Sequence, residues 1–300
     1  MTTISAIVPT FQRAGLLVEA LRSLFAQDRP VHEIVVWDDG STDDTGAAVE
    51  GLKAEAPVPL RYFRAENAGK SRALNRAMAE TTGEAIWICD DDDRCRPGAA
   101  RLLAAALETA PVAGGSYRRF GLDQETGAAV DADPGYWPDL AEGSMLRHLL
   151  EDIFIFQNAT LATRQAYDRV GPFREDLPRS IDYDMIVRLA ARFPVAFVDA
   201  VLFDQRKHDG ARGAQAARHA ARDSETVWLA NDQAVFLGFR ETLPLGLYEA
   251  MFETAEPALA SRAALIQRGA VHARRGLWAL ALEDIEAAAA MTDAGPLSRV

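Results

Sequence analysis

Short apolar runs alternate with amphipathic segments through the first hundred positions of the chain. Four runs have the length and β-branched content of buried strands, and they lie at 4–10, 33–38, 60–66 and 84–90. The segments between them carry apolar residues at helical spacing. Strands that alternate with helices in this way predict an α/β fold with a mostly parallel, doubly wound sheet. Such sheets bind ligands at the carboxyl ends of their strands.

The pattern changes between about 112 and 205, where strands and long loops replace the regular alternation. Further strands are predicted at 116–121, 154–163 and 195–203, and a helix is predicted near 180–193. We expect these elements to continue the sheet with mixed strand directions.

Beyond residue 213 the chain becomes helical and rich in alanine. Apolar residues in 263–290 repeat at helical spacing, and the segment is similar to one tetratricopeptide-like hairpin, although stable arrays need about three such units. We therefore expect an α/β domain at 1–210 and a C-terminal α-helical region at 211–300. That region either packs on the main domain or recruits a partner.

Composition and charge exclude several classes of protein. The 300 residues are 49% apolar, and their formal net charge of −12 opposes binding to nucleic acid, which requires clustered cations. No apolar stretch approaches the ~20 residues of a membrane-spanning helix. The start MTTISAIVPTFQR also lacks the features of a signal peptide. We therefore expect a cytoplasmic protein without a transmembrane segment, for which peripheral membrane association stays open.

Four consecutive aspartates, Asp90 to Asp93, follow the fourth apolar run directly. Carboxylates crowded at the end of a buried strand need a counter-charge. Mg²⁺ or Mn²⁺ supplies one, because hard cations prefer carboxylate and phosphate oxygens. A solvent-exposed acidic turn is the alternative for a bare run of aspartates. The first and second runs end at Pro9, Thr10 and Phe11 and at Asp38 and Asp39, so these residues are expected at the same edge of the sheet.

The segment NAGKSRALN places a glycine turn before a helix. Its Gly69-Lys70-Ser71 imitates the end of a P-loop, but position 64 is arginine where that pattern needs glycine. The helix N-terminus with Lys70 and Arg72 favours a diphosphate, and two surface cations are the alternative. His208 lies in a polar turn after a strand, where either a metal or phosphate ligand or an ordinary loop histidine fits.

Taken together, these segments resemble the family 2 glycosyltransferases of the GT-A fold, which move a sugar from a nucleotide diphosphate donor. The matching pieces are SAIVPTFQR, EIVVWDDGSTDDT, NAGKSRALNRAMAETTGEAIWICDDDD and, further on, VGPFREDLPRSIDYDMIVRLA with QRKHDG. The resemblance covers about 1–100 well and continues in part to 210. It implies a GT-A, Rossmann-like sheet that carries the donor site, with the helical region as an appendage.

The resemblance also implies roles for individual residues. Pro9 and Phe11 would line the base pocket, and Asp39 would accept a hydrogen bond from the base. The full set of implied donor-binding residues is Pro9, Thr10, Phe11, Arg13, Asp38, Asp39, Lys70, Arg72, Asp90 and Asp91. Arg72 is expected to replace a cation, because Leu74 stands where the family often has arginine. The implied ligands of Mn²⁺ or Mg²⁺ are Asp92 and His208.

Asp182 falls where the family keeps the base that activates the acceptor, although Ile181 precedes it where glutamate is usual. The resemblance therefore implies an inverting, metal-dependent transferase of class EC 2.4, with a UDP-sugar as the favoured donor. A glycan or another hydroxyl compound, in cell-surface polysaccharide or glycoconjugate synthesis, would be the acceptor. A catalytically silent nucleotide-sugar-binding scaffold is the alternative. A nucleotidyltransferase ranks third, because it normally has a glycine-rich basic loop after the first strand.

Overall fold

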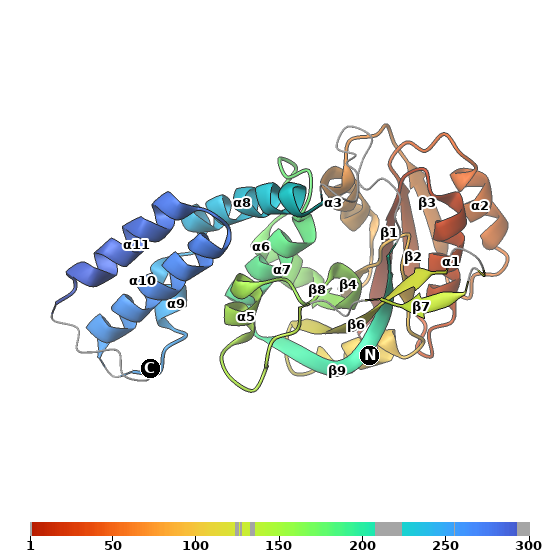
Figure 1. Ribbon diagram of the computed structural model, residues 1–300. Helices are drawn as coiled ribbons and strands as arrows, with labels where there is room; N and C mark the ends of the chain where they lie inside the picture. The colour runs from red at the N-terminus through yellow and green to blue at the C-terminus, as the bar shows by residue number, and fades with distance from the viewer. Residues whose placement is uncertain are drawn as a thin grey trace. The chain divides into compact units, whose positions relative to one another are not determined.

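The structure is a computed structural model that describes residues 2–123, 126, 128–132, 136–207, 224–254 and 256–292. The chain divides into two compact units. The first, called here the α/β unit, comprises Met1–Trp137 and Phe154–Arg218. The second, the helical unit, comprises Pro138–Ile153 and His219–Val300. Figure 1 shows the strands of the α/β unit and the helices of the other.

The described part of the α/β unit forms one sheet with the strand order β3-β2-β1-β4-β8-β6-β9-β5, and β7 pairs with β6. The strands are β1 (Ile4–Thr10), β2 (Glu33–Asp38), β3 (Leu60–Arg64), β4 (Ala85–Ile88), β5 (Arg94–Cys95), β6 (Val112–Leu122), β7 (Ala129–Asp131), β8 (Thr160–Thr163) and β9 (Val195–Arg206). Strands β3, β2, β1 and β4 run parallel. Strand β8 is antiparallel to both β4 and β6, which confirms the mixed directions expected after residue 112.

Helices connect these strands and build the second unit. In the α/β unit they are α1 (Ala14–Phe25), α2 (Thr45–Leu52), α3 (Lys70–Glu80), α4 (Ala99–Ala106), the 3₁₀ turn η1 (Gln157–Ala159), α6 (Arg164–Val170) and α7 (Ile181–Arg192). The helical unit contains α5 (Met145–Glu151), α8 (Ser224–Thr242), α9 (Leu245–Glu249), α10 (Pro257–Arg274) and α11 (Trp278–Ala290). Among the described helices, none is long and apolar enough to cross a membrane.

The central strands are buried on both faces, which explains their continuous apolar runs. Every residue of β1 and of β2 is buried. Alternate side chains of β1, such as Ile4 and Val8, pack in one core cluster with Leu17 and Leu21 of α1. Ile7 points to the opposite face of the strand and is also fully buried. Both faces of the sheet are therefore covered, as in other parallel sheets.

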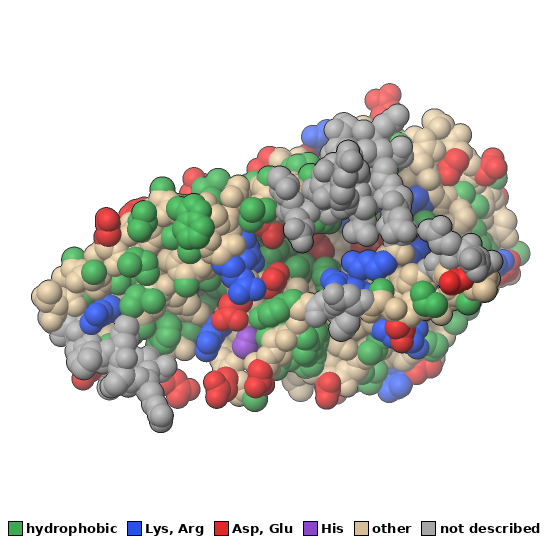
Figure 2. Space-filling view, viewed as in Figure 1, with side chains coloured by type: hydrophobic (Ala, Val, Ile, Leu, Met, Phe, Trp, Pro, Cys, Tyr) green, Lys and Arg blue, Asp and Glu red, His purple; other side chains and the backbone are tan. Residues whose placement is uncertain are grey.

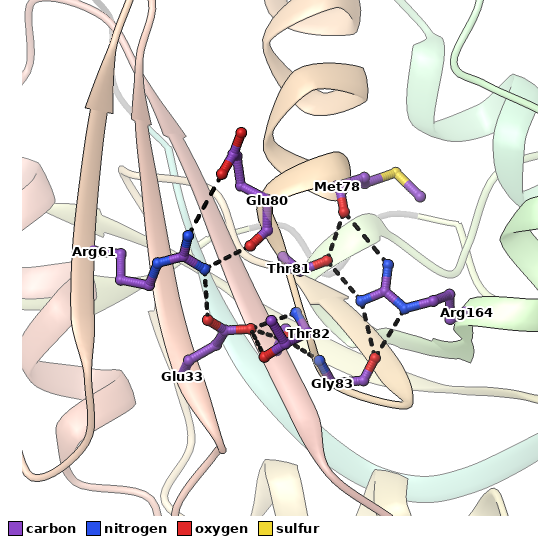
Figure 3. A network of polar contacts seen from close by, with 9 residues as sticks. Glu33, Arg61, Met78, Glu80, Thr81, Thr82, Gly83 and Arg164 are labelled. Atoms are coloured by element: carbon purple, nitrogen blue, oxygen red, sulfur yellow. Dashed lines mark hydrogen bonds and ion pairs between the residues drawn. The ribbon is translucent and has the colours of Figure 1, made fainter.

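A polar network fixes the amino ends of these strands (Figure 3). The Glu33 carboxylate accepts hydrogen bonds from the Ser5 hydroxyl at 2.8 Å and from the backbone N–H of Thr82 at 2.6 Å, and it pairs with Arg61 at 3.0 Å. Desolvation of Glu33 opposes ionisation, but these partners hold its pKa at about 2. Glu33 is thus a buried carboxylate whose charge is satisfied within the protein.

The helical unit leaves part of its apolar surface in solvent. On α11, Ala281 and Ala288 are buried, whereas Trp278, Leu282 and Ile285 are exposed. Apolar side chains are accordingly visible over α11 in Figure 2. Neither the packing role nor the partner-binding role of this unit is tested by these contacts, so its role stays a prediction.

Candidate active site

The predicted site residues meet at the carboxyl edge of the parallel strands. Thr10, the last residue of β1, pairs with Asp38, the last residue of β2. The backbone N–H of Asp39 then donates to the Thr10 carbonyl at 2.9 Å. On the other side of β1, Cys89 donates its N–H to the Ile7 carbonyl at 2.9 Å, which brings the end of β4 to the same edge. The strand register therefore places all three polar strand ends side by side.

Asp38 and Asp39 have different surroundings at the end of β2. Asp38 is fully buried and accepts hydrogen bonds from the Ser41 N–H at 2.7 Å and from the Tyr62 hydroxyl at 2.5 Å. Asp39 accepts hydrogen bonds from the N–H groups of Ala68 at 3.0 Å and of Gly69 at 2.9 Å. Burial raises the pKa of Asp39, and the two backbone donors oppose that rise. Asp39 thus ties the end of β2 to the glycine turn before α3.

Two side-chain cations pair with carboxylates of Asp90 to Asp93, called here the acidic row. One nitrogen of Arg13, Nη1, lies 2.9 Å from Asp91 Oδ1 and 2.7 Å from Asp92 Oδ2. The Lys70 ammonium, at the first residue of α3, lies 2.5 Å from Asp90 Oδ1. Desolvation disfavours the charged Lys70, but Asp90 and Asp182 raise its pKa, so its ammonium stays protonated. The edge of the sheet therefore carries acids and cations together.

The acidic row remains electrostatically strained despite these partners. Burial raises the pKa of Asp91 to about 6; the neighbouring Asp92 adds to the rise and Arg13 opposes it. Burial, with Asp92 and Asp90 beside it, also raises the pKa of Asp93 well above its usual range. Glu33 in the same unit shows that this fold can satisfy a buried carboxylate when hydrogen-bond donors surround it. A carboxylate with a raised pKa in such a position is typical of a functional site.

A polar support beneath the row comes from residues that the sequence reasoning missed. Asn158 accepts the Asp90 N–H at 2.9 Å and donates to Asp93 Oδ2 at 3.3 Å. The backbone N–H of Arg206, the last residue of β9, donates to Asp93 Oδ1 at 2.8 Å. The signal for Asn158 was a Gln-Asn pair inside the apolar run 154–163, which was predicted as a strand. The structure instead forms the turn η1 there, and β8 begins only at Thr160.

The residues near Asp91 and Asp92 fit a divalent cation. Their carboxylates already converge on one cationic atom, Arg13 Nη1. The side-chain oxygen of the buried Gln157 has no hydrogen-bond partner among the described residues, while its nitrogen lies 3.5 Å from Asp90. Carboxylate and amide oxygens are the ligands that hard cations prefer. Within the described ranges, however, no three His, Cys, Asp or Glu side chains form a ready metal cluster. The other predicted ligand, His208, lies outside the described residues.

Asp182 lies in the first turn of α7, next to Asp184, but the two carboxylates differ. Asp184 is buried and pairs with Arg188 at 2.8 Å, so its charge serves the packing of α7. Burial raises the pKa of Asp182; the Lys70 ammonium opposes that rise and Asp90 adds to it. Lys70 and Asp90 thus both act electrostatically on the carboxylate of Asp182.

The remaining predicted residues lie around this edge in varied settings. Pro9 and Thr10 are buried at the end of β1, and Phe11 is half-buried after it. The Arg72 guanidinium lies 2.8 Å from Glu175, so it is engaged on the surface of α3. Leu74 is fully buried, so this position belongs to the core here.

The known proteins that are similar to this chain agree with its fold and with its strand-end motifs. The sequence profile of Glycosyl transferase family 2 matches residues 5–170, which is more than half of the chain. The chain is 26% identical over 198 residues to the uncharacterized glycosyltransferase YwdF of Bacillus subtilis (strain 168), covering 64% of this chain and 69% of that protein. It spans only 34% of the length of two further curated relatives.

Two solved structures show the same fold. The crystal structure of S. aureus TarS 1-349 in complex with UDP-GlcNAc is similar with a TM-score of 0.61 and 20% identity, over 95% of this chain and 89% of that one. The mannosyltransferase PcManGT of Pyrobaculum calidifontis, in complex with GDP-Man and Mn²⁺, has a TM-score of 0.56 and 22% identity, over 99% of this chain and 76% of that one. The expected GT-A fold with its helical C-terminal region is confirmed.

Proposed function

Because this chain belongs to glycosyl transferase family 2, we propose that it transfers a sugar from a nucleotide diphosphate to a hydroxyl acceptor in a single, inverting displacement that requires Mn²⁺ or Mg²⁺. The favoured donor is a UDP-sugar, and the acceptor is a glycan or glycoconjugate hydroxyl. One observation carries the proposal: at the carboxyl edge of the sheet, the carboxylates of Asp91 and Asp92 converge on a single cationic atom.

In the proposed function, the donor binds along the carboxyl edge of the sheet. Pro9, Thr10 and Phe11 lie at the end of β1, and Asp39 holds the glycine turn before α3. The base therefore packs against the end of β1, within reach of Asp39. The diphosphate lies near Lys70 and the N-terminus of α3, because both favour anions. Asp90 orients Lys70 through its 2.5 Å contact.

Asp92, the metal ligand implied by the resemblance, would hold the divalent cation together with Asp91, which the resemblance placed among the donor-binding residues. The side-chain oxygen of Gln157, which has no hydrogen-bond partner among the described residues, would be a further ligand. When bound, that cation neutralises the charge that develops on the departing diphosphate. The protein's own part is to keep the acidic row in place: Asn158 accepts the backbone N–H of Asp90, and the backbone N–H of Arg206 donates to the carboxylate of Asp93. Since the chain has a net charge of −12, an anionic donor needs this local positive charge more than it would in a basic protein.

Asp182 acts as the general base. As the acceptor oxygen attacks the anomeric carbon, a carboxylate oxygen of Asp182 takes the hydroxyl proton, and the sugar–phosphate bond breaks with its electrons moving to the diphosphate. The raised pKa of Asp182 favours this role, because a base works best when its pKa lies near the working pH. General base catalysis of this kind contributes about 10²–10⁴-fold to the rate.

The test combines a panel of nucleotide sugars with one matched pair of variants. The wild-type protein with Mn²⁺ is expected to bind and slowly hydrolyse one class of donor, and UDP-sugars are expected to lead. Asp182→Asn should lower turnover by about 10²-fold or more while leaving the donor Kd within about twofold. Asp168→Asn, at an exposed position of α6, is the control for the same chemical change. Donor binding without turnover in any condition would instead identify a silent nucleotide-sugar-binding scaffold.

A further inference from the structure

Arg13 lies where a divalent cation is expected. Its Nη1 atom is within 2.9 Å of an oxygen of Asp91 and within 2.7 Å of an oxygen of Asp92. A single nitrogen that bridges two carboxylates neutralises the same pair of oxygens that a metal ion would use. Arg13 therefore competes with any cation for Asp91 and Asp92.

The two cations cannot share these oxygens. Mg²⁺ binds carboxylate oxygens at about 2.0–2.1 Å, and each like charge in so small a space opposes the other. A guanidinium in hydrogen-bond contact with both acids must consequently leave at least one of them when the metal binds. Before the exchange, desolvation disfavours the charge of Arg13, but Asp91 and Asp92 raise its pKa. After the exchange it stays protonated as well, because a guanidinium does not lose its proton in proteins.

The Arg13 side chain reaches solvent, whereas the backbone before it is held. About a third of the side chain (32%) is exposed to solvent. The preceding residue, Gln12, has a left-handed backbone with φ of 57°, and its N–H donates to the Ser41 hydroxyl at 2.9 Å. The side-chain oxygen of Gln12 accepts the N–H groups of Thr42 and Asp43, each at 3.2 Å. A change of partner by Arg13 therefore needs a turn of its side chain and no change in the backbone before it.

We propose that Arg13 is an exchangeable counter-ion of the acidic row. In the free protein it holds Asp91 and Asp92 together. On binding, the divalent cation takes over these carboxylates, and the guanidinium moves to the diphosphate oxygens of the donor. A guanidinium suits this second partner because it donates two parallel hydrogen bonds to phosphate oxygens.

The exchange couples the metal to the donor. Without a donor, Mn²⁺ must displace Arg13 and leave its charge without a new partner, so metal binding is weakened. With a donor present, the displaced guanidinium gains the diphosphate, so metal and donor each strengthen the binding of the other. This inference rests on the proposed function, because it assumes a diphosphate donor.

The first experiment measures Mn²⁺ alone, by the loss of its free-ion electron paramagnetic resonance signal on titration with protein. Arg13→Gln removes the competing cation, so it should bind Mn²⁺ about fivefold more tightly than the wild type. Arg22→Gln, which removes the same charge from an exposed ion pair of α1 with Glu55, should bind Mn²⁺ as the wild type does. Circular dichroism and thermal melting check that both variants fold.

The second experiment measures UDP binding by calorimetry with saturating Mn²⁺. Arg13→Gln should bind UDP about tenfold more weakly or worse, because the diphosphate loses its charged donor. In the wild type, Mn²⁺ should strengthen UDP binding much more than it does in Arg13→Gln. The variant thus gains affinity for the metal and loses affinity for the nucleotide, a pair of opposite changes that a purely structural role for Arg13 does not produce.

An Arg13→Gln protein whose Mn²⁺ affinity equals or falls below that of the wild type overturns the exchange, even if the wild type binds UDP and the proposed function holds. A wild type that binds UDP-sugars equally well with chelator contradicts the metal step of the proposed function. If Arg13→Gln fails to fold, arginine side-chain nuclear magnetic resonance of the wild type decides the matter. One guanidinium resonance should change on addition of Mg²⁺, and a spectrum without any change overturns the inference.

Discussion

The ionised Asp91 carboxylate should destabilise the metal-free protein. Replacing Asp91 with asparagine should therefore raise the free energy of unfolding while it impairs function. Its side chain is buried, and its pKa is raised from 3.8 to about 6 by burial and by Asp92, against the effect of Arg13. Each pKa unit corresponds to about 1.4 kcal/mol, so the ionised Asp91 costs about 3 kcal/mol at pH 8 relative to the unfolded chain. Asp91→Asn mimics the protonated acid and removes most of that cost.

The sign of the pH dependence follows from the same pKa. Because the folded protein binds a proton at Asp91 more tightly than the unfolded chain does, ionisation of this group destabilises the fold as pH rises. The loss of wild-type stability begins near the unfolded pKa of 3.8 and is complete just above pH 6. The difference in unfolding free energy between Asp91→Asn and the wild type should therefore be small at pH 4 and reach about 2–3 kcal/mol at pH 8.

Urea denaturation in the presence of chelator measures this difference. Glu33→Gln is the matched control variant, for which the opposite change in unfolding free energy is expected. Both substitutions turn a buried carboxylate into an amide. The pKa of Glu33 is lowered from 4.5 to about 2. Its ionised form therefore stabilises the fold by about 3 kcal/mol above pH 5. This stabilisation is lost as pH falls through 4.5 towards 2. Glu33→Gln should therefore destabilise the protein at pH 8. An Asp91→Asn variant that is less stable than the wild type at pH 8, or whose advantage is the same at pH 4, would refute the reasoning.

Three further outcomes are expected. The affinity for Mn²⁺ should fall as pH is lowered from 7.5 to 5, because Asp91 takes up a proton near pH 6. A paramagnetic resonance titration at each pH measures this affinity. A constant affinity would count against Asp91 as a ligand. Asn158→Ala should lower the unfolding free energy by about 1–3 kcal/mol in urea, since it removes a partner of the buried Asp93; an unchanged midpoint would mean that Asp93 is satisfied without it. Gly83→Ala should lower the unfolding free energy by about 1–3 kcal/mol. A Cβ at this position would lie 2.6 Å from the Ser5 hydroxyl oxygen and 2.7 Å from the Ser5 nitrogen. A thermal melt equal to that of the wild type would contradict this packing.

The parallel half of the sheet was predictable because both of its faces are covered. Strands such as β1 and β2 then need apolar residues at every position, and the sequence shows continuous apolar runs there. The strand-end acids were predictable for the same reason, since a polar residue directly after such a run must lie at the edge of the sheet. Asp90 to Asp93 and Asp39 all lie there.

Long-range contacts were not predictable from local pattern. Asn158 and Arg206 contact residues of the acidic row that lie 65 or more positions away in the chain. Only the turn η1 before β8 and the register of β9 bring them there. The two-residue strand β5 is too short to show any periodicity. The segment Pro138–Ile153 belongs to the helical unit although it lies within the α/β part of the sequence, and no change of composition marks it. The partners of Arg13 likewise depend on side-chain positions that no spacing encodes.

The most direct measurement is the anomalous scattering of manganese in crystals grown with Mn²⁺ and UDP. A manganese peak in contact with Asp91 or Asp92 and with the diphosphate, with Arg13 turned away from at least one of these acids, is the expected result. Crystals in which UDP is bound while no manganese lies at these aspartates would contradict the proposal that the acidic row holds the cation for the donor.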